Sequence, residues 1–319
     1  MSQLAPADFN DLALRLFRHQ AANNEVYAAY IHHLGVKVEE VGGVSEIPFL
    51  PISFFKNHLV QTGQWTPETI YTSSGTTGAV TSRHAVWSEA FYVRHAEEIF
   101  RHFFGAIEQY HVLALLPSYL ERAGSSLVVM AQHFVKQSGS SDSGFYLYNV
   151  DELMSRLIRL RANSKKVLLL GVTFALLDLA ERFEEDLSHC VVMETGGMKG
   201  RRPEITRQEL HDILQKRLHL ASVTSEYGMT ELMSQAYSKG SGVFEAPWSM
   251  KVLLRDPEDP LDVSETREQG AINIIDLANF HSCAFIETQD LGKMHPGGYF
   301  EVLGRMDNSD IRGCNLMVG

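Results

Sequence analysis

Cysteine, basic charge and long apolar runs are all scarce in this sequence of 319 residues. The three cysteines lie far apart and form no CxxC pair, so we expect neither a zinc site nor a disulfide framework. This cysteine usage suits a reducing compartment. Acidic residues outnumber basic ones by 39 to 28, which argues against nucleic-acid binding because that function needs a basic face. No apolar run approaches the roughly 18 residues of a membrane span.

The start of the chain likewise lacks a basic region followed by an apolar one, so we expect no signal peptide and a cytoplasmic location. Apolar residues make up 45% of the chain and charged residues 21%, which excludes the disordered, collagen-like and coiled-coil classes. At about 150 residues per domain, the length predicts roughly two domains. A chain of this size can bury a sufficient core without a metal or disulfide.

The middle of the sequence alternates short apolar stretches with longer amphipathic ones. We expect strands at 111–116, 166–171, 189–194 and 221–225, and helices at 151–162, 174–186 and 203–218. This alternation predicts βαβ units and a parallel sheet with helices on both faces. After residue 248, apolar stretches at 250–254, 271–275 and 299–303 predict a small antiparallel β subdomain. We therefore expect an α/β core at 1–248 and a β subdomain with a hinge and tail at 249–319, joined in one continuous structural domain.

One stretch after residue 71 is rich in hydroxyl side chains and glycine: Thr72, Ser73, Ser74, Gly75, Thr76, Thr77 and Gly78. Such residues bury little apolar surface, but their backbone N–H groups and hydroxyls can wrap around an oxyanion. The Gly-Lys-Ser/Thr ending of a P-loop is absent. A flexible surface loop is the simpler interpretation. The interleaved residues and the structured flanks favour phosphate binding.

This loop resembles the first signature of adenylate-forming enzymes, the superfamily of acyl- and aryl-CoA synthetases, luciferases and peptide-synthetase adenylation domains. There the loop cradles the phosphates of ATP. Residues 226–231 resemble the second signature, which implies that Tyr227 and Gly228 lie beside adenine, Thr230 near the α-phosphate, and Glu231 on Mg²⁺. A carboxylate is the ligand that this hard cation prefers. Taken alone, the segment is equally typical of a strand end turning into a helix.

Three further segments follow the superfamily order. Residues 287–292 resemble the motif whose aspartate holds the ribose hydroxyls, which assigns that role to Asp290. Residues 304–307 resemble the hinge motif, whose Arg305 reaches ribose or phosphate, and Gly196 and Gly197 follow an apolar stretch where the superfamily keeps a small-residue loop beside adenine. Each segment alone fits a turn. Together they span residues 71–319 and imply the N-terminal domain fold of adenylate-forming enzymes, with layered βαβ sheets.

A narrower resemblance is to the acyl-protein synthetase (LuxE-type) family, carried by residues 47–51, 55–56, 117–126 and 312–316. It implies a ligase that activates a carboxylic acid, expected to be a fatty acid, with ATP and Mg²⁺. The acyl group then moves from acyl-AMP to a cysteine near the C-terminus as a thioester, and onward to a partner acyl reductase. Cys314 occupies that position. As a lone cysteine, it would more simply be a small buried apolar residue.

Two departures from the superfamily concern its cations. No lysine follows the first loop, so Arg83 is the nearest cation there, and the chain ends at Gly319, where we expect the C-terminal lid domain with its lysine to be absent. Lys199 and Arg305 are the other candidate cations. His84 either faces the substrate or is structural. An acid–CoA ligase related to phenylacetate–CoA ligase and an inactive nucleotide-binding scaffold remain alternative functions.

Overall fold

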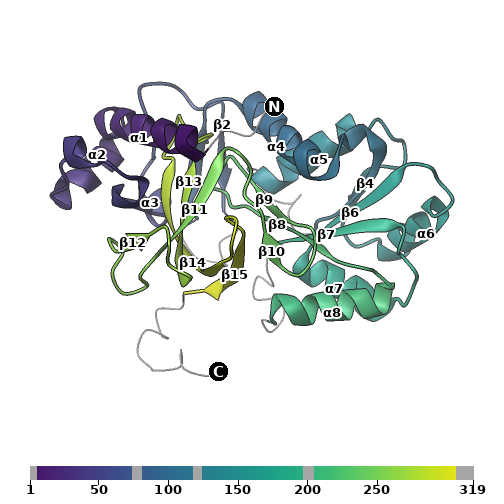
Figure 1. Cartoon of the computed structure of the whole chain (residues 1–319). Helices are drawn as coiled ribbons and strands as arrows, with labels where there is room; N and C mark the ends of the chain where they lie inside the picture. The colour runs from purple at the N-terminus through teal and green to yellow at the C-terminus, as the bar shows by residue number, and fades with distance from the viewer. Residues whose placement is uncertain (1–5, 74–80, 118–123, 197–204, 307–319) are drawn as a thin grey trace.

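The computed structural model describes residues 6–73, 81–117, 124–196 and 205–306 (Figure 1). Its α-helices in these ranges are α1 (Pro6–Asn23), α2 (Glu25–His33), α3 (Phe54–Asn57), α4 (Glu89–Phe104), α5 (Ser126–Gln137), α6 (Val150–Leu160), α7 (Thr173–Arg182) and α8 (Arg207–Leu218). Short 3₁₀ helices cover Val38–Glu40, Val44–Glu46 and Ile107–Gln109. No helix among the described residues combines the length and apolar character needed to cross a membrane.

A sheet of six strands forms one half of the molecule, in the order β5-β4-β6-β7-β8-β9. Its strands are β4 (Tyr110–Leu115), β5 (Gly144–Tyr146), β6 (Lys166–Val172), β7 (Cys190–Thr195), β8 (Thr224–Tyr227) and β9 (Ala236–Ser238). All neighbours pair in parallel except β8 and β9. Helices α4 and α5 lie on one side of this sheet and α7 and α8 on the other (Figure 1). The expected parallel sheet with helices on both faces is confirmed.

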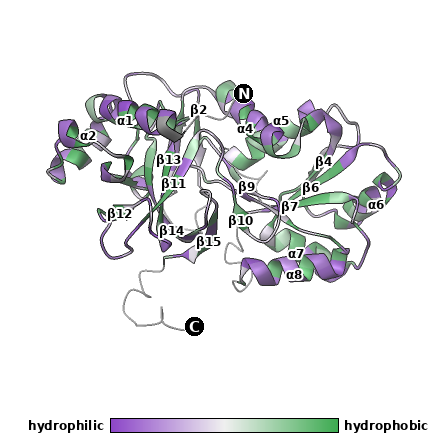
Figure 2. Ribbon diagram, viewed as in Figure 1, coloured by the Kyte–Doolittle hydropathy of each residue, from purple (hydrophilic) through white to green (hydrophobic). Residues whose placement is uncertain are grey.

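Covering both faces explains why the central strands read as continuous apolar runs. Every residue of β4 is buried, and in β6 only the first residue is exposed. Figure 2 shows apolar residues along these strands and hydrophilic residues on the outer surface of α8. Helix α6 turns its four buried residues inward, namely Leu153, Met154, Leu157 and Leu160.

A second sheet of seven strands forms the other half, in the order β10-β15-β14-β13-β11-β12, with β1 also paired to β14. Its strands are β1 (Leu50–Pro51), β10 (Val243–Phe244), β11 (Met250–Arg255), β12 (Val263–Ser264), β13 (Gln269–Asp276), β14 (Phe285–Met294) and β15 (Phe300–Arg305). All pairs are antiparallel except β1 with β14. The expected antiparallel sheet is confirmed. Strands from both sides of residue 248 contribute to it.

The N-terminal helices belong to this second half. Phe17 of α1 and Tyr27 of α2 pack against Phe285 of β14, with ring centroids about 6.0 Å apart in each case. Apolar residues 9–60 and 250–300 share one buried cluster, which also includes Tyr227 of β8 and Ala236 of β9. Most apolar residues of the six-stranded sheet form another cluster. Between the halves lies the two-stranded hairpin of β2 (Thr69–Thr72) and β3 (Arg83–Val86).

Several expected boundaries of helices and strands were wrong. Helix α8 begins at Arg207 because Thr206 and Glu209 form a reciprocal capping box there. Helix α7 ends at Arg182, and strand β8 begins at Thr224 instead of 221. The ten-residue strand β14 was missed, since its second half carries polar residues that resemble a turn.

Candidate functional site

The two ends of the hydroxyl- and glycine-rich loop are held together by the β2–β3 hairpin. The backbone N–H of Ser73 donates to the Ser82 carbonyl (3.1 Å), and the Ser82 N–H donates to the Ser73 hydroxyl (2.9 Å). Thr72 is fixed through its backbone N–H, which donates to the carbonyl of Gly124 (2.8 Å). The loop residues Ser74, Gly75, Thr76, Thr77 and Gly78 lie outside the described residues.

Glycine is required at position 124, where the chain after β4 comes close to β2. Its φ is +84°, and a Cβ at this position would lie 2.9 Å from the carbonyl oxygen of Ile70 in β2. Both facts exclude larger residues, because L-residues avoid this φ and a backbone oxygen cannot move aside cheaply. The chain after β4 therefore runs close against the strand that leads into the loop.

Glu231 lies beside Ser82, at the described end of this loop, and is 4% exposed. Burial raises the pKa of its carboxyl, whereas a hydrogen bond with the Ser82 side chain and the charges of Arg305 and Lys56 oppose that rise. Glu231 thus adjoins the loop end at Ser82 from a segment almost 150 residues later in the sequence. A carboxylate in this position can face a cation that is itself bound to phosphate oxygens.

Strand ends from both halves of the molecule meet next to Glu231. The hydroxyl of Tyr227, at the end of β8, donates to Asp290 of β14 at 2.8 Å. Arg305 of β15 is the register partner of Asp290, and its Nε lies 3.9 Å from the Asp290 carboxylate. Burial raises the pKa of Asp290, opposed by the Tyr227 hydrogen bond and by nearby arginines. A carboxylate with one oxygen already paired can still accept hydrogen bonds from vicinal hydroxyls.

Tyr227→Phe should therefore lower the free energy of unfolding by about 1–3 kcal/mol at neutral pH, because the Asp290 carboxylate loses a donor. The Tyr227 hydroxyl lowers the pKa of Asp290, so it stabilises the ionised form. The difference from wild type should shrink as the pH falls through the pKa of Asp290. Urea unfolding at pH 7.5 and pH 4 measures this. An equal loss at both values would show that the hydroxyl serves packing instead.

Two glycines of the expected site disfavour a side chain, for different reasons. Gly196 has a φ of +72°, and its carbonyl accepts a hydrogen bond from the Thr173 hydroxyl at 3.0 Å. A Cβ on Gly228 would collide with a carboxylate oxygen of Glu226. Both residues are exposed, and each directly follows a strand of the parallel sheet, Gly196 after β7 and Gly228 after β8. Gly197 lies outside the described residues.

The other expected residues are distributed differently. Arg83 is exposed, on the face of β3 opposite to Ser82 and the buried His84, so it is not brought to Glu231. Lys199 and Cys314 lie outside the described residues. Lys56, which sequence reasoning left without a role, is exposed on α3, and its charge acts on Glu231.

His84 and Cys283 are buried, and Cys190 is half-buried. His84 is 1% exposed, and its Nδ1 lies 2.8 Å from the Thr230 carbonyl oxygen. Burial lowers the pKa of His84, so the neutral imidazole donates this hydrogen bond. Burial raises the pKa of both Cys190 and Cys283 to about 12. Neither thiol is therefore a ready nucleophile at neutral pH.

Two buried carboxylates next to the site were missed by sequence reasoning. Glu226 of β8 accepts a hydrogen bond from Thr195 of β7, and burial raises its pKa to about 7. Glu194 of β7 lies on the other face of the sheet, where Arg207 donates to it at 3.0 Å. Burial would raise the pKa of Glu194, but hydrogen bonds from His211 and Arg207 lower it overall. Their positions within apolar strands were the available signal, because an unpaired buried carboxylate is costly.

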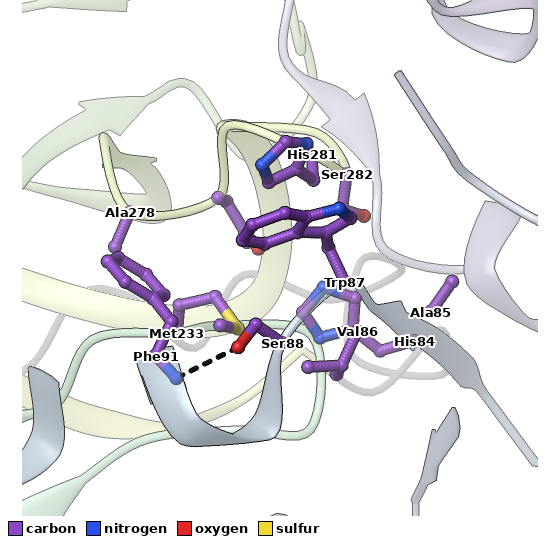
Figure 3. Close-up of a pocket in the computed structure, with 11 residues that line it drawn as sticks. His84, Ala85, Val86, Trp87, Ser88, Phe91, Met233, Ala278, His281 and Ser282 are labelled. Carbon is purple, nitrogen blue, oxygen red and sulfur yellow. Dashed lines mark hydrogen bonds between the residues drawn. The ribbon is translucent and has the colours of Figure 1, made fainter. Parts of the chain in front are cut away.

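A small pocket lies next to Met233, between β3, the start of α4 and the loop at 278–282 (Figure 3). Trp87 and His281 stack on each other along one side of it, with ring centroids 4.6 Å apart (Figure 3). Met233 and Phe91 line the opposite wall. Among the described residues, no three carboxylate, histidine or cysteine side chains gather into a metal cage.

No protein-family model and no curated protein sequence matches the chain. Similar folds occur among solved structures. The O-succinylbenzoate coenzyme A synthetase of Bacillus subtilis, in complex with AMP, is 19% identical with a TM-score of 0.54, covering 77% of this chain and 51% of its own. Apo MatB from Rhodopseudomonas palustris is 15% identical with a TM-score of 0.52, covering 77% and 49%.

A long-chain-fatty-acid–CoA ligase from Archaeoglobus fulgidus is 14% identical with a TM-score of 0.52, covering 74% of this chain and 51% of its own. The chain thus spans about half the length of these structures. At such low identity the likeness concerns the fold, and the mixed α/β layers agree with it. The chain has the fold of the N-terminal domain of adenylate-forming enzymes.

Proposed function

We propose that this protein is an acid ligase that activates a carboxylic acid with ATP and Mg²⁺. The observation that carries the proposal is the convergence of Tyr227, Asp290 and Arg305 beside Glu231 and the loop end at Ser82. These residues come from four separate segments of the chain. A core alone would not require two carboxylates, a tyrosine hydroxyl and an arginine at one meeting point of two sheets.

The described residues suit the nucleoside part of ATP. Asp290 is held by Tyr227 at one oxygen and can accept the two ribose hydroxyls with the remaining lone pairs. Arg305 is 74% exposed along its side chain and can reach ribose or phosphate from the edge of β15. Gly196 and Gly228 leave room for a flat base beside Tyr227, since neither carries a side chain.

Glu231 suits a magnesium ion that is shared with phosphate. Mg²⁺ in nucleotide sites is commonly held by one or two carboxylates together with phosphates and waters, and Glu231 is a buried carboxylate next to the loop end at Ser82. When bound, Mg²⁺ neutralises negative charge on the phosphates. Lys56 and Arg305 add positive charge around the same carboxylate. Positioning and charge neutralisation are the main requirements of such phosphorus chemistry.

In the first step, a carboxylate oxygen of the acid attacks the α-phosphorus of ATP. The bond to the bridging oxygen breaks, and pyrophosphate leaves with that electron pair, giving acyl-AMP. In the second step, the Cys314 thiolate attacks the acyl carbonyl and AMP departs, which leaves a thioester. A partner acyl reductase would then take the acyl group. The resemblance to the LuxE-type family carries the assignment of the acceptor role to Cys314. The other two thiols are poorer candidates, because Cys283 is buried, Cys190 is half-buried, and the pKa of both is raised to about 12.

A second candidate is an acid–CoA ligase, in which free coenzyme A takes the acyl group. The names of the similar structures favour it, since two of the three are CoA synthetases or ligases. The adenylation step would be the same in both candidate functions. Only the acceptor differs, so one experiment separates the two.

We expect the purified protein with ATP, Mg²⁺ and a fatty acid to release pyrophosphate and gain the mass of one acyl group. Cys314→Ala should keep pyrophosphate release and lose the adduct, with Cys190→Ala as the matched control that retains it. Intact-mass spectrometry and a pyrophosphate assay measure both. Acyl-CoA formation by Cys314→Ala when CoA is added would favour the second candidate. Absence of pyrophosphate release across fatty, aromatic and short acids would overturn the acid ligase proposal.

A further inference from the structure

The segment that carries Glu231 has no helix or strand of its own. Residues 229–234, which we call the Glu231 segment, form turns between β8 and β9. Buried backbone groups need partners, and a segment without regular structure must find them among side chains. Two backbone N–H groups of this segment are bound by the second sheet. Those of Met233 and Ser234 both donate to Asp276 of β13, at 2.8 and 2.9 Å.

The carbonyl of Glu231 itself is bound by Asn279. The Asn279 side chain amide donates to this oxygen at 2.7 Å, and Asn279 is 1% exposed. Asn279 lies in the tight turn after β13, where its own N–H donates to the Asp276 carbonyl at 3.0 Å. Figure 3 shows this turn, from Ala278 to Ser282, facing His84 of β3. The backbone next to the Glu231 side chain is therefore fixed from a loop of the other sheet.

The N-terminal helix α1 binds the turn after β13. The Gln20 side chain amide of α1, fully buried, has its nitrogen 3.0–3.2 Å from the carbonyl oxygens of Asn279, Phe280 and Ser282. Its oxygen accepts from the N–H of Ala284 at 2.9 Å. One amide thus binds four backbone groups of a loop some 260 residues away in the sequence.

A second buried amide supports the same loop from the start of α2. Asn24, the N-cap of that helix, donates to the Ser282 carbonyl at 3.0 Å, and the hydroxyl of Thr62 also donates to it. All three polar side chains, Gln20, Asn24 and Thr62, are buried. Each buried polar side chain must be fully hydrogen-bonded to avoid a loss of stability, so apolar side chains would meet the needs of packing more simply.

We propose that Asn279, held by Gln20, is a positioning residue that sets Glu231 for the bound magnesium ion. The inference rests on the proposed function. A relay of buried hydrogen bonds runs from α1 through the turn after β13 to the Glu231 carbonyl. Without the Asn279 amide, the Glu231 carbonyl loses its hydrogen-bond donor, and the Glu231 carboxylate can leave the position facing Ser82. The N-terminal helices then serve metal binding as well as packing.

The test measures metal binding directly. We would titrate Mg²⁺ into the enzyme with saturating ATP by calorimetry, and measure ATP affinity separately with EDTA present. Outer residues that orient metal ligands typically contribute about 10–100-fold in affinity. We expect Asn279→Ala to weaken Mg²⁺ binding about 10-fold and Gln20→Met to weaken it less, with metal-free ATP affinity unchanged. Leu16→Ala, a core change on the same helix, is the matched control for lost stability.

A double-mutant cycle separates positioning from general damage. In the Glu231→Gln background, Asn279→Ala should cause no further loss of Mg²⁺ affinity, because the group it positions is already gone. Additive losses, or an equal loss with Leu16→Ala, would overturn the inference while leaving the proposed function intact. If wild-type protein binds ATP equally well with and without Mg²⁺, the proposed function fails at its metal step and this inference fails with it.

Discussion

Glu231→Gln should slow pyrophosphate release by about 100- to 1000-fold, the loss typical when a preorganised group facing transition-state charge is removed. Glutamine keeps the size of the side chain and its contact with Ser82 but removes the negative charge. Burial raises the pKa of Glu231, so the ionised form is unfavourable in the folded protein. The variant should therefore be at least as stable as wild type at neutral pH, even though it is inactive.

Activity and stability moving in opposite directions distinguish a site residue from a structural one. Glu258→Gln is the matched control, because it removes the same charge from an exposed turn. We expect it to leave the rate within about twofold, as is usual for surface substitutions away from the site. Chelation of Mg²⁺ with EDTA should reduce wild-type activity to the level of Glu231→Gln. A Glu231→Gln variant with wild-type rate would show that this carboxylate does not serve the metal.

Glu226→Gln should stabilise the protein by up to about 3 kcal/mol at pH 8 and have little effect at pH 4. Burial raises the folded-state pKa of Glu226 from 4.5 to about 7. Such a group favours folding below the unfolded pKa, and that contribution is lost as the pH rises through 7. Glutamine does not titrate, so the advantage of the variant should grow across that window. Urea unfolding at several pH values measures it.

Glu194→Gln should change the free energy of unfolding in the opposite direction at pH 8, so it is the control for Glu226→Gln. Hydrogen bonds from His211 and Arg207 lower the pKa of Glu194 in the folded protein. Its contribution is therefore present at neutral pH and is lost as the pH falls below its unfolded value. The variant should be destabilised at pH 8 and approach wild type in acid. A pH-independent effect in either variant would show that packing outweighs ionisation at these positions.

Local pattern was enough for the four central strands of the six-stranded sheet, β4, β6, β7 and β8, whereas the short edge strands β5 and β9 were missed. The central strands are buried on both faces, so their apolar runs stand out, and the helices of this sheet show one apolar side. The antiparallel character of the region after residue 248 was likewise visible. Boundaries failed where capping decided them, as at Thr206, or where a strand carries polar residues, as in β14.

The resemblance of short segments also pointed to Tyr227, Glu231, Asp290 and Arg305, but nothing in the sequence showed that they meet. Their separation along the chain hides the contact, since pairing between β14 and β15 and the approach of β8 are tertiary events. Arg83 illustrates the reverse case. It follows the loop closely in sequence, yet the alternation of β3 turns it to the opposite face from Ser82.

By itself, the sequence determined which residue types are available: a hydroxyl-glycine loop, strands with continuous apolar faces, and a few polar residues at their ends. Tertiary structure alone decided which of these share a site. Glu231 is positioned by Asn279 and Gln20, whose roles depend on contacts across 48 and 259 residues. Buried amides and carboxylates acquire their properties from the partners and the dielectric that surround them, and those exist only once the two sheets have packed together.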